Sequence, residues 1–336
     1  MFVADRLLWR GQPSQAPWFQ RRMARVHDLH RHHAVPVTPL ALTELGSDAT
    51  REDFLAASDQ YRRPVVLRGF IAGCEATRCW TDQTLRTRFD GRDCTVLRFD
   101  SDQDWDTGAP TERMPFGDYL DRMRSEPLYL NSSTELASEP VLQALGLDRV
   151  LGLRDPRVDV LPLTNLFIGS DRVHSALHAA PAGNFFLNAV GRKRWTLTDP
   201  AHSALLAPVM RPPYQYVRSA FGGYRSHGER LRCLPRFEVV LQPGDVLYNA
   251  PWWWHEVDNL DPLTVGCSVR RVPALGRASA SWANQPLFTA CSLYPWTRVA
   301  VAAHTLYARV SPNPTPLREL MNRLNTRVQE RVLRKA

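Results

Sequence analysis

The sequence is poor in lysine: 42 residues are lysine or arginine, and only Lys193 and Lys335 are lysines. It also lacks an apolar run long enough for a membrane span and begins without the apolar stretch of a secretory signal peptide. We therefore expect an intracellular protein, cytoplasmic or nuclear. The net charge of +8 favours an acidic or nucleic-acid partner weakly, because a general bias toward arginine explains it more simply.

The sequence also lacks cysteines at metal-binding spacing. Six cysteines are present, and none of their spacings matches that of a zinc finger. Most stand alone in apolar stretches such as "TVGCSV", which is typical of buried free thiols. A reducing compartment follows from this pattern. No zinc-finger, RRM or helix-turn-helix motif points to nucleic-acid binding.

Short β-branched segments separated by turn residues dominate the middle of the chain. Helical patterns cover 18–33 and 115–124, and Thr81 is placed as the N-cap of a further helix. Strands are predicted over 63–70, 93–99, 127–133 and 163–170, followed by closely spaced short strands as far as about 272. Glycine at 191 and "QPGD" at 242–245 have turn composition, the first of them at a hairpin position. This organisation favours an all-β sandwich or barrel over a parallel α/β sheet.

Three regions are expected along the chain. Residues 1–39 form a basic helical extension, 40–275 a barrel domain with its N-terminal support, and 276–336 a C-terminal helical region. The last region has an apolar stripe at helical spacing: Leu317, Leu320, Met321, Leu324, Val328 and Val332. This stripe must be buried against the protein's own core or against a second copy in a homodimer.

Three motifs occur in a fixed order: a histidine ending a strand at His178, then "NFFLNAVGRKRWTL", then "LQPGDVLYNAPWWWHEVDN". With these spacings, roughly residues 40–275 resemble the JmjC/cupin-like Fe(II)/2-oxoglutarate-dependent oxygenases, especially the asparaginyl-hydroxylase-like group. The resemblance implies a mainly β fold, a double-stranded β-helix or jelly-roll barrel with flanking N-terminal α/β elements and a C-terminal helix. It also implies Fe(II) and 2-oxoglutarate as cofactors. The implied activity is that of a hydroxylase or demethylase, acting on a protein or RNA substrate.

The resemblance assigns the metal ligands to His178 and His255. In this family a His-x-Asp/Glu motif and a distant histidine hold the iron. The acid of that motif falls on Ala180, whose methyl group cannot ligate a metal. The chain therefore has an atypical site with two histidines and an incomplete facial triad. Trp253, two residues before His255, is expected on the same face of the strand as a wall beside the metal.

The sequence matches the family better at the residues that hold 2-oxoglutarate than at the metal ligands. The family's lysine for the far carboxylate of 2-oxoglutarate comes nine residues after the motif asparagine, which is Asn184 here, and this places it at Lys193. Tyr129 and Ser175 are assigned hydroxyl contacts to the same ligand. An asparagine common on the last barrel strand is replaced by Gly266, Cys267 or Ser268.

Three interpretations of the missing acid stay open at this point. The chain is an oxygenase of reduced or altered activity, with another group in the gap; His174 is the nearest substitute, and Asp171 and Asp199 are further candidates. His174 has a difficulty, because four residues of strand span roughly 13 Å from His178. Alternatively, the chain is an inactive pseudo-oxygenase that serves as a binding module. In the third interpretation it is a 2-oxoglutarate-dependent halogenase with chloride at the vacant ligand position, by analogy with a different branch of the superfamily.

Overall fold

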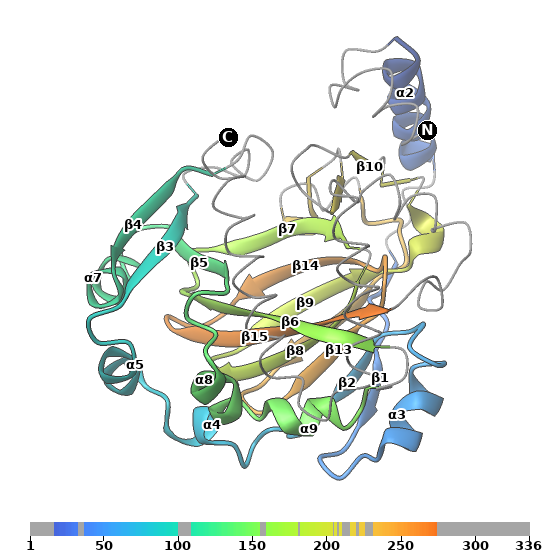
Figure 1. Ribbon diagram of the computed structural model, residues 1–336. Coiled ribbons are helices and arrows are strands. Elements are labelled where there is room, and N and C mark those ends of the chain that lie inside the picture. The colour runs from blue at the N-terminus through green and yellow to red at the C-terminus, as the bar shows by residue number, and fades with distance from the viewer. Residues whose placement is uncertain are drawn as a thin grey trace.

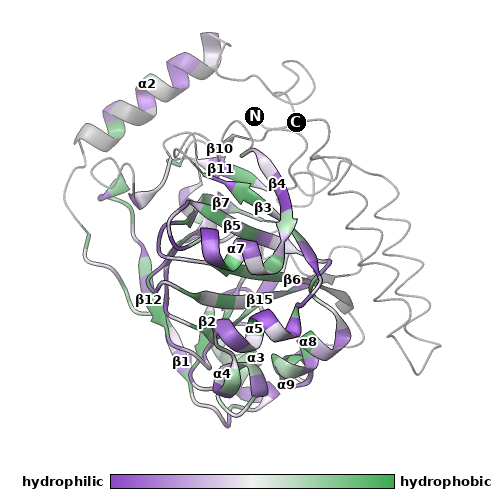
Figure 2. Cartoon of the chain, turned by 90° about the vertical axis from the view of Figure 1, so that its left-hand side faces the viewer, coloured by the Kyte–Doolittle hydropathy of each residue, from purple (hydrophilic) through white to green (hydrophobic). Residues whose placement is uncertain are grey.

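The structure is a computed structural model (Figure 1). It describes residues 17–32, 37–99, 109–154, 159–180, 182–203, 205–206, 208–209, 216–219, 222–225 and 231–273. The predicted C-terminal helix, and with it the homodimer contact, lies outside the described residues. Most of the predicted N-terminal extension on either side of its helix also lies outside the described residues. The helix itself is α2, Pro17–His32, which lies apart from the barrel in Figures 1 and 2.

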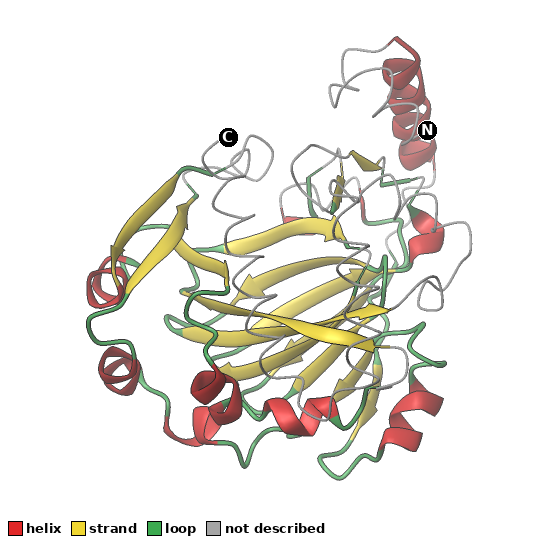
Figure 3. Cartoon of the chain, viewed as in Figure 1, coloured by secondary structure: helices red, strands yellow, loops and turns green. Residues whose placement is uncertain are grey.

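Two β-sheets face each other and form the body of the molecule (Figures 1 and 3). In spatial order the nine-stranded sheet contains β1 (Thr43–Leu45), β2 (Val65–Leu67), β13 (Val246–Asn249), β8 (Gly183–Val190), β15 (Thr264–Pro273), β6 (Asp159–Gly169), β5 (Leu128–Ser133), β3 (Asp93–Arg98) and β4 (Thr111–Pro115). The six-stranded sheet contains β10 (Pro208–Val209), β11 (Val217–Ser219), β7 (His174–Ala179), β14 (Trp254–Asn259), β9 (Lys193–Thr198) and β12 (Phe237–Leu241).

Short helices border the nine-stranded sheet (Figure 3). They are α3 (Arg51–Ala57), α4 (Glu75–Cys79), α5 (Asp82–Arg88), α7 (Phe116–Arg122), α8 (Glu139–Ala144) and α9 (Leu147–Leu151), and a 3-10 turn, η2 (Pro200–His202), follows β9. The predicted cap is present: the Thr81 hydroxyl accepts the amide of Thr84, and the Thr84 hydroxyl accepts the amide of Thr81. These reciprocal bonds pair two amides that the first helical turn leaves without partners.

Alternation along the central strand β15 separates the hydrophobic core from the barrel interior. Val265, Cys267 and Val269 are buried in the main core, which the nine-stranded sheet shares with the helices. Residues of the other parity face the opposite sheet, since the Thr264 hydroxyl accepts a hydrogen bond from Lys193 of β9. Of the last-strand positions considered from the sequence, Cys267 therefore faces away from the interior. Figure 2 shows the resulting mixture of apolar strands and polar surface helices.

Glycine 191 makes a corner between the sheets, and the hairpin predicted there is wrong. The strands before and after it, β8 and β9, belong to different sheets, so they do not pair with each other. Gly191 has a φ of +68°, and a Cβ on it would lie 2.3 Å from the carbonyl oxygen of Leu263. Only glycine fits this conformation and this close approach. The corner brings Lys193 to the start of β9, at the barrel interior.

The second predicted turn, "QPGD", is likewise a crossing, from β12 to β13. Its aspartate, Asp245, is buried and accepts hydrogen bonds from the amides of Gly69 (2.8 Å) and Gln242 (2.9 Å). It also pairs with the guanidinium of Arg68 at 2.6 Å. The aspartate thus ties the crossing to the strand β2.

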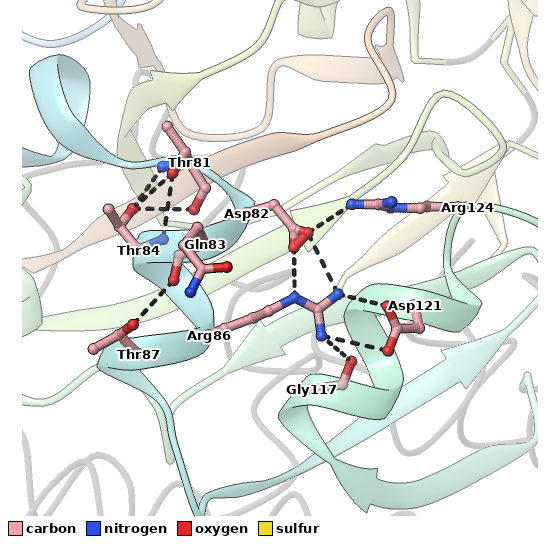
Figure 4. Close-up of polar contacts among 9 residues, drawn as sticks. All are labelled: Thr81, Asp82, Gln83, Thr84, Arg86, Thr87, Gly117, Asp121 and Arg124. Carbon is pink, nitrogen blue, oxygen red and sulfur yellow. Dashed lines mark hydrogen bonds and ion pairs between the residues drawn. The ribbon is translucent and has the colours of Figure 1, made fainter.

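A polar network joins α5 to the helix α7 (Figure 4). The Arg86 guanidinium pairs with Asp82 on its own helix at 2.9 Å and with Asp121 at 2.6 Å, and it donates to the carbonyl of Gly117. Arg124 contacts Asp82 at 2.6 Å. These are partly exposed ion pairs, which orient the helices at the rim without adding much stability.

Candidate binding site inside the barrel

The structure brings His178 and His255 together. They occupy register-paired positions of the neighbouring strands β7 and β14, and their ring centroids lie 4.1 Å apart. Each ring directs Nδ1 at a backbone carbonyl: His178 at Ala176 (2.7 Å) and His255 at Trp253 (3.0 Å). If Nδ1 carries the proton in both rings, Nε2 is left with its lone pair on each.

Both imidazoles are held neutral. Burial, together with a smaller contribution from the nearby Arg270 charge, lowers the pKa of His255 to about 4, although the hydrogen bond to the Trp253 carbonyl raises it. Burial and the neighbouring His255 lower the pKa of His178 well below its usual range, with further contributions from Arg218 and Arg270. The charged form of an imidazole is disfavoured where water is excluded and other cations are close.

No carboxylate completes the pair within the described part of the chain, where no group of three His, Cys, Asp or Glu side chains could hold a metal. Ala180 follows the end of β7, and its carbonyl accepts the amide of Trp252 at 2.8 Å. Asp171 is exposed, and Asp199 caps η2 by accepting the amide of Ala201. Glu256, adjacent to His255, accepts the amides of Tyr224 and Arg225 instead.

His174 lies on the other side of β7 from the histidine pair. A β-bulge between His255 and Val257 shifts the register, so that Val257 is opposite Ser175 and Asp258 is opposite His174. Ser175 bonds to Tyr129 across the barrel, so His174 faces outward with Asp258, which contacts Arg225. Regular alternation would have put His174 and His178 on one face, and the bulge prevents this.

Two arginines approach the histidine pair. Arg218 of β11 is register-paired with His178, and its guanidinium donates to the Tyr216 hydroxyl at 3.1 Å. The ring of Tyr216 meets the ring of His178 edge-on, with centroids 5.2 Å apart. Arg270 of β15 comes from the opposite sheet, and burial lowers the pKa of its guanidinium, although it keeps some accessible surface. The centre between the sheets is therefore electropositive.

Lys193 lies at the other end of the interior and is fully buried, with 0% of its surface exposed. Its ammonium donates to the hydroxyl of Thr264 (3.0 Å) and the side-chain oxygen of Asn259 (2.5 Å). Both acceptors are neutral, and burial alone lowers the pKa of Lys193 to about 7. A buried ammonium without a negative partner is costly, so the chemistry of this end of the barrel suits an anion.

The hydroxyls predicted to accompany Lys193 lie beside it. Tyr129 is buried on β5 and bonds to Ser175, while burial raises the pKa of its phenol above its usual range. Gly169, opposite both Tyr129 and Thr264, closes the wall, since a Cβ there would be 2.8 Å from the tyrosine ring. The Thr264 hydroxyl bonds the Gly169 carbonyl at 2.9 Å.

Trp195, which no sequence motif indicated, lines the interior between the histidine pair and Lys193. Its indole stacks on His255 with centroids 5.6 Å apart and an interplanar angle of 17°, and it meets Phe186 at 5.1 Å. Its position two residues after Lys193 on one strand was the available signal, because such residues share a face. Trp253, expected beside the histidines, instead packs on Phe237 and donates to the carbonyl of Arg62. The strand β14 starts only at Trp254, so alternation does not extend back to Trp253.

Asparagines and Arg270 form a row across the nine-stranded sheet. Asn249, Asn184 and Arg270 are register-paired on the neighbouring strands β13, β8 and β15. The amide nitrogen of Asn249 lies 3.0 Å from Nδ1 of His255, so the row faces the histidines. The side-chain oxygens of Asn184 and Asn249 are buried and have no hydrogen-bond partner in the described structure. Turning the Asn249 amide places its oxygen at Nδ1 of His255, where it accepts the proton carried there; the Asn184 oxygen still lacks a donor in the described structure.

This donor set does not fit the iron site of a complete facial triad. The two Nε2 atoms suit a metal, and the backbone carbonyls on Nδ1 are what such ligands commonly have behind them. A third ligand is absent from the described residues, however, and Arg218 and Arg270 supply positive charge where a divalent cation would need negative charge. The Lys193 end, by contrast, fits a carboxylate.

The two facing sheets, with residues of both meeting in the interior, define a double-stranded β-helix of the cupin and JmjC kind. A family model described as "Cupin-like domain" matches residues 51–269, and the chain belongs to this family. HSPB1-associated protein 1 of Mus musculus is 38% identical over 109 residues, a match that covers 30% of this chain and 22% of that protein.

Two more distant similarities accompany this match. The bifunctional arginine demethylase and lysyl-hydroxylase psr-1 of Caenorhabditis elegans is 22% identical over 233 residues, covering 64% of this chain and 57% of that protein. The X-ray structure of E. coli ycfD aligns with 18% identity and a TM-score of 0.44 over 68% of this chain and 54% of that one. The chain thus matches about a fifth of the mouse relative and just over half of the nematode one. Within the described residues, no helix is long and apolar enough to cross a membrane.

Proposed function

We propose that the barrel is a binding module derived from the Fe(II)/2-oxoglutarate oxygenases, and that it takes 2-oxoglutarate or a similar small dicarboxylate. In this proposal it acts as a pseudo-oxygenase. Its ligand is held by Lys193, with Tyr129, Ser175 and Asn184 around it. Turnover of the hydroxylase or demethylase type is absent or strongly reduced.

The observation that carries the proposal is the state of Lys193. Its ammonium is fully buried and, among the residues that the structure describes, is bonded only to Thr264 and Asn259, both neutral. An ammonium has three donors, so one remains for a ligand. A carboxylate there would restore the charge balance that burial disturbs, and charge-assisted hydrogen bonds of this kind are about twice as strong as neutral ones.

The absence of a third ligand among the described residues argues against ordinary oxygenase turnover. Ala180 stands at the acid position, and arginine charges lie near both imidazoles. Metal held by two neutral ligands near two cations is bound weakly. The structural evidence therefore favours the binding module over an active oxygenase.

A metal-dependent oxygenase or halogenase is the second candidate. It is favoured by one observation: the backbone carbonyls at Nδ1 leave the Nε2 atoms of His178 and His255 available side by side. An anion from solution, chloride in the halogenase case, would have to take the place of the missing carboxylate. A protein or nucleic-acid substrate is part of this proposal, supported only by the net charge of +8.

The test is calorimetric titration of 2-oxoglutarate into the full chain, with and without Fe(II) and without oxygen. We expect saturable binding that Lys193→Met abolishes. Lys335→Met, which removes the same charge from the chain's other lysine, serves as the matched control. Lack of binding under both conditions contradicts the proposal. Succinate release above the background without protein favours the second candidate instead.

A further inference from the structure

Arg270 is the one charged side chain in the row that faces the histidine pair, and the described structure shows no hydrogen bond or ion pair for it. It stands beside Asn184 in register, and the Asn184 side-chain oxygen is buried without a partner. Its charge reaches both imidazoles, because it lowers the pKa of each. Around the histidines there is thus a guanidinium and no carboxylate among the described residues.

A guanidinium in this place has two consequences. It repels a divalent cation from the two Nε2 atoms, since like charges interact strongly where water is excluded. It also offers a planar array of five donors whose geometry matches a carboxylate. The side-chain oxygen of Asn184 has no hydrogen-bond partner in the described structure. The side-chain amide can therefore turn and present its nitrogen to an anion.

Aromatic side chains line the interior from Lys193 to the histidine pair, and they offer an apolar surface to the carbon chain of a dicarboxylate. Phe186 lies 5.8 Å from the Lys193 ammonium, measured to the ring centroid, and 5.1 Å from Trp195. Trp195 in turn stacks on His255. Two aromatic rings therefore connect the cationic end at Lys193 with His255, one of the two imidazoles on which the Arg270 charge acts.

We propose that Arg270 forms a second carboxylate subsite beside His178 and His255, so that the barrel binds a dicarboxylate without a metal ion. One carboxylate lies at Lys193, and the other lies at Arg270 and Asn184, where the guanidinium supplies the positive charge that iron supplies in a complete site. This inference rests on the proposed function for the Lys193 end. It goes beyond that function by assigning the second end and by removing the need for iron.

The subsite makes a specific prediction about ligand choice. A metal that chelates a keto acid uses its keto oxygen, so glutarate, which lacks that oxygen, is a poor ligand of such a site. A guanidinium uses only the carboxylate. The Arg270 subsite is therefore expected to bind glutarate within a few-fold of 2-oxoglutarate, and butyrate, which has a single carboxylate, much more weakly.

The experiment is titration of 2-oxoglutarate, glutarate and butyrate into the full chain in buffer stripped of metal by a chelating resin. Wild-type protein is expected to bind both dicarboxylates, and Arg270→Gln is expected to weaken them by about 10- to 100-fold, the scale of a lost charge-assisted contact. Arg270→Lys keeps the charge without the planar donors, so its affinity for both dicarboxylates is expected to lie between those of the wild type and Arg270→Gln. Arg113→Gln, at an exposed arginine of β4 outside the interior, is the control for a general loss of positive charge, and melting temperatures establish that each variant is folded.

The outcomes separate this inference from the proposed function. Binding that appears only when Fe(II) is added, or that Arg270→Gln leaves unchanged, overturns the Arg270 subsite and leaves the Lys193 end in place. A strong preference for 2-oxoglutarate over glutarate also counts against it. Binding under no condition overturns both. If Arg270→Gln does not fold, Arg270→Lys together with the preference between 2-oxoglutarate and glutarate decides the question.

Discussion

His178 and Arg270 lie on opposite sheets of the barrel and approach each other closely enough for the guanidinium to lower the pKa of the imidazole. In a metal site a histidine of this kind would face a metal ion and its anionic ligands. Here it has a second histidine, a tyrosine and arginines as neighbours. This relationship makes the centre of the barrel electropositive.

Placing an acid at position 180 is expected to restore metal binding only when the competing positive charge of Arg270 is removed as well. Ala180→Asp alone places its carboxylate in the field of Arg270, which competes with the metal for it. The double variant Ala180→Asp/Arg270→Asn has three ligands and one cation fewer, so we expect it to bind Co(II) at least tenfold more tightly than either single variant.

The readout of this prediction is the visible absorption of Co(II) during titration under nitrogen. The matched control is His255→Ala in the double background, which should abolish the gain. Equal affinities in the double variant and in wild type would show that the acid and Arg270 do not set the metal preference.

The pH dependence of ligand binding is expected to follow Lys193. Its pKa in the free protein is about 7, below the usual value of 10.5, because it is buried. A bound carboxylate favours the charged ammonium and raises this pKa, so binding takes up a proton at and above pH 7. Affinity for 2-oxoglutarate should therefore fall as the pH rises from 7 to 9.

Proton uptake is measured by calorimetry in buffers of different ionisation enthalpy.

The lowered pKa of Lys193 also affects the stability of the ligand-free protein. Because the folded pKa lies below the unfolded one, the contribution of Lys193 to stability grows as the pH rises from about 7 to 10.5 and is lost as it falls back through that range. Lys193→Met should remove this slope; a slope that persists unchanged would mean that another group causes it.

Asp245→Asn is expected to destabilise the fold by roughly 2–4 kcal/mol. The carboxylate accepts the amides of Gly69 and Gln242 and pairs with Arg68. An asparagine has one acceptor oxygen, so its amino group would face a donor. Glu44→Gln, at the exposed partner of the same arginine, should cost less than about 1 kcal/mol. Urea denaturation measures both, and equal losses would contradict the assigned role of burial.

Gly191→Ala and Gly91→Ala form a matched pair. Both glycines have positive φ, +68° and +65°, but a Cβ at Gly91 meets nothing within 4 Å, while one at Gly191 meets the Leu263 carbonyl at 2.3 Å. Gly91→Ala should cost only the left-handed backbone penalty, about 1 kcal/mol. Gly191→Ala should cost clearly more and weaken ligand binding, because it moves Lys193. Thermal melts and the 2-oxoglutarate titration measure the two effects, and equal melting temperatures would contradict the close approach.

Local patterns in the sequence predicted many elements of this fold correctly. The strands β2, β3, β5 and β6 and the helices α5 and α7 lie where β-branched runs, caps and helical spacing placed them. The cupin-like fold was predicted from three motifs in order, and the family match over residues 51–269 confirms it. Local patterns predicted the turn at "QPGD" correctly and failed at Gly191, because turn composition does not tell whether the next strand continues in the same sheet.

The sequence by itself determined that Ala180 cannot be a ligand and that Lys193, nine residues after Asn184, is the lysine to examine, because residue chemistry and spacing are local properties. Only the tertiary structure decided what surrounds them. The β-bulge that turns His174 outward and the alternation that turns Cys267 into the core depend on strand pairing. Arg270 reaches the histidines from the opposite sheet. A strand's neighbours lie far away in the sequence, so the charge at the centre of the barrel became evident only when the two sheets were set face to face.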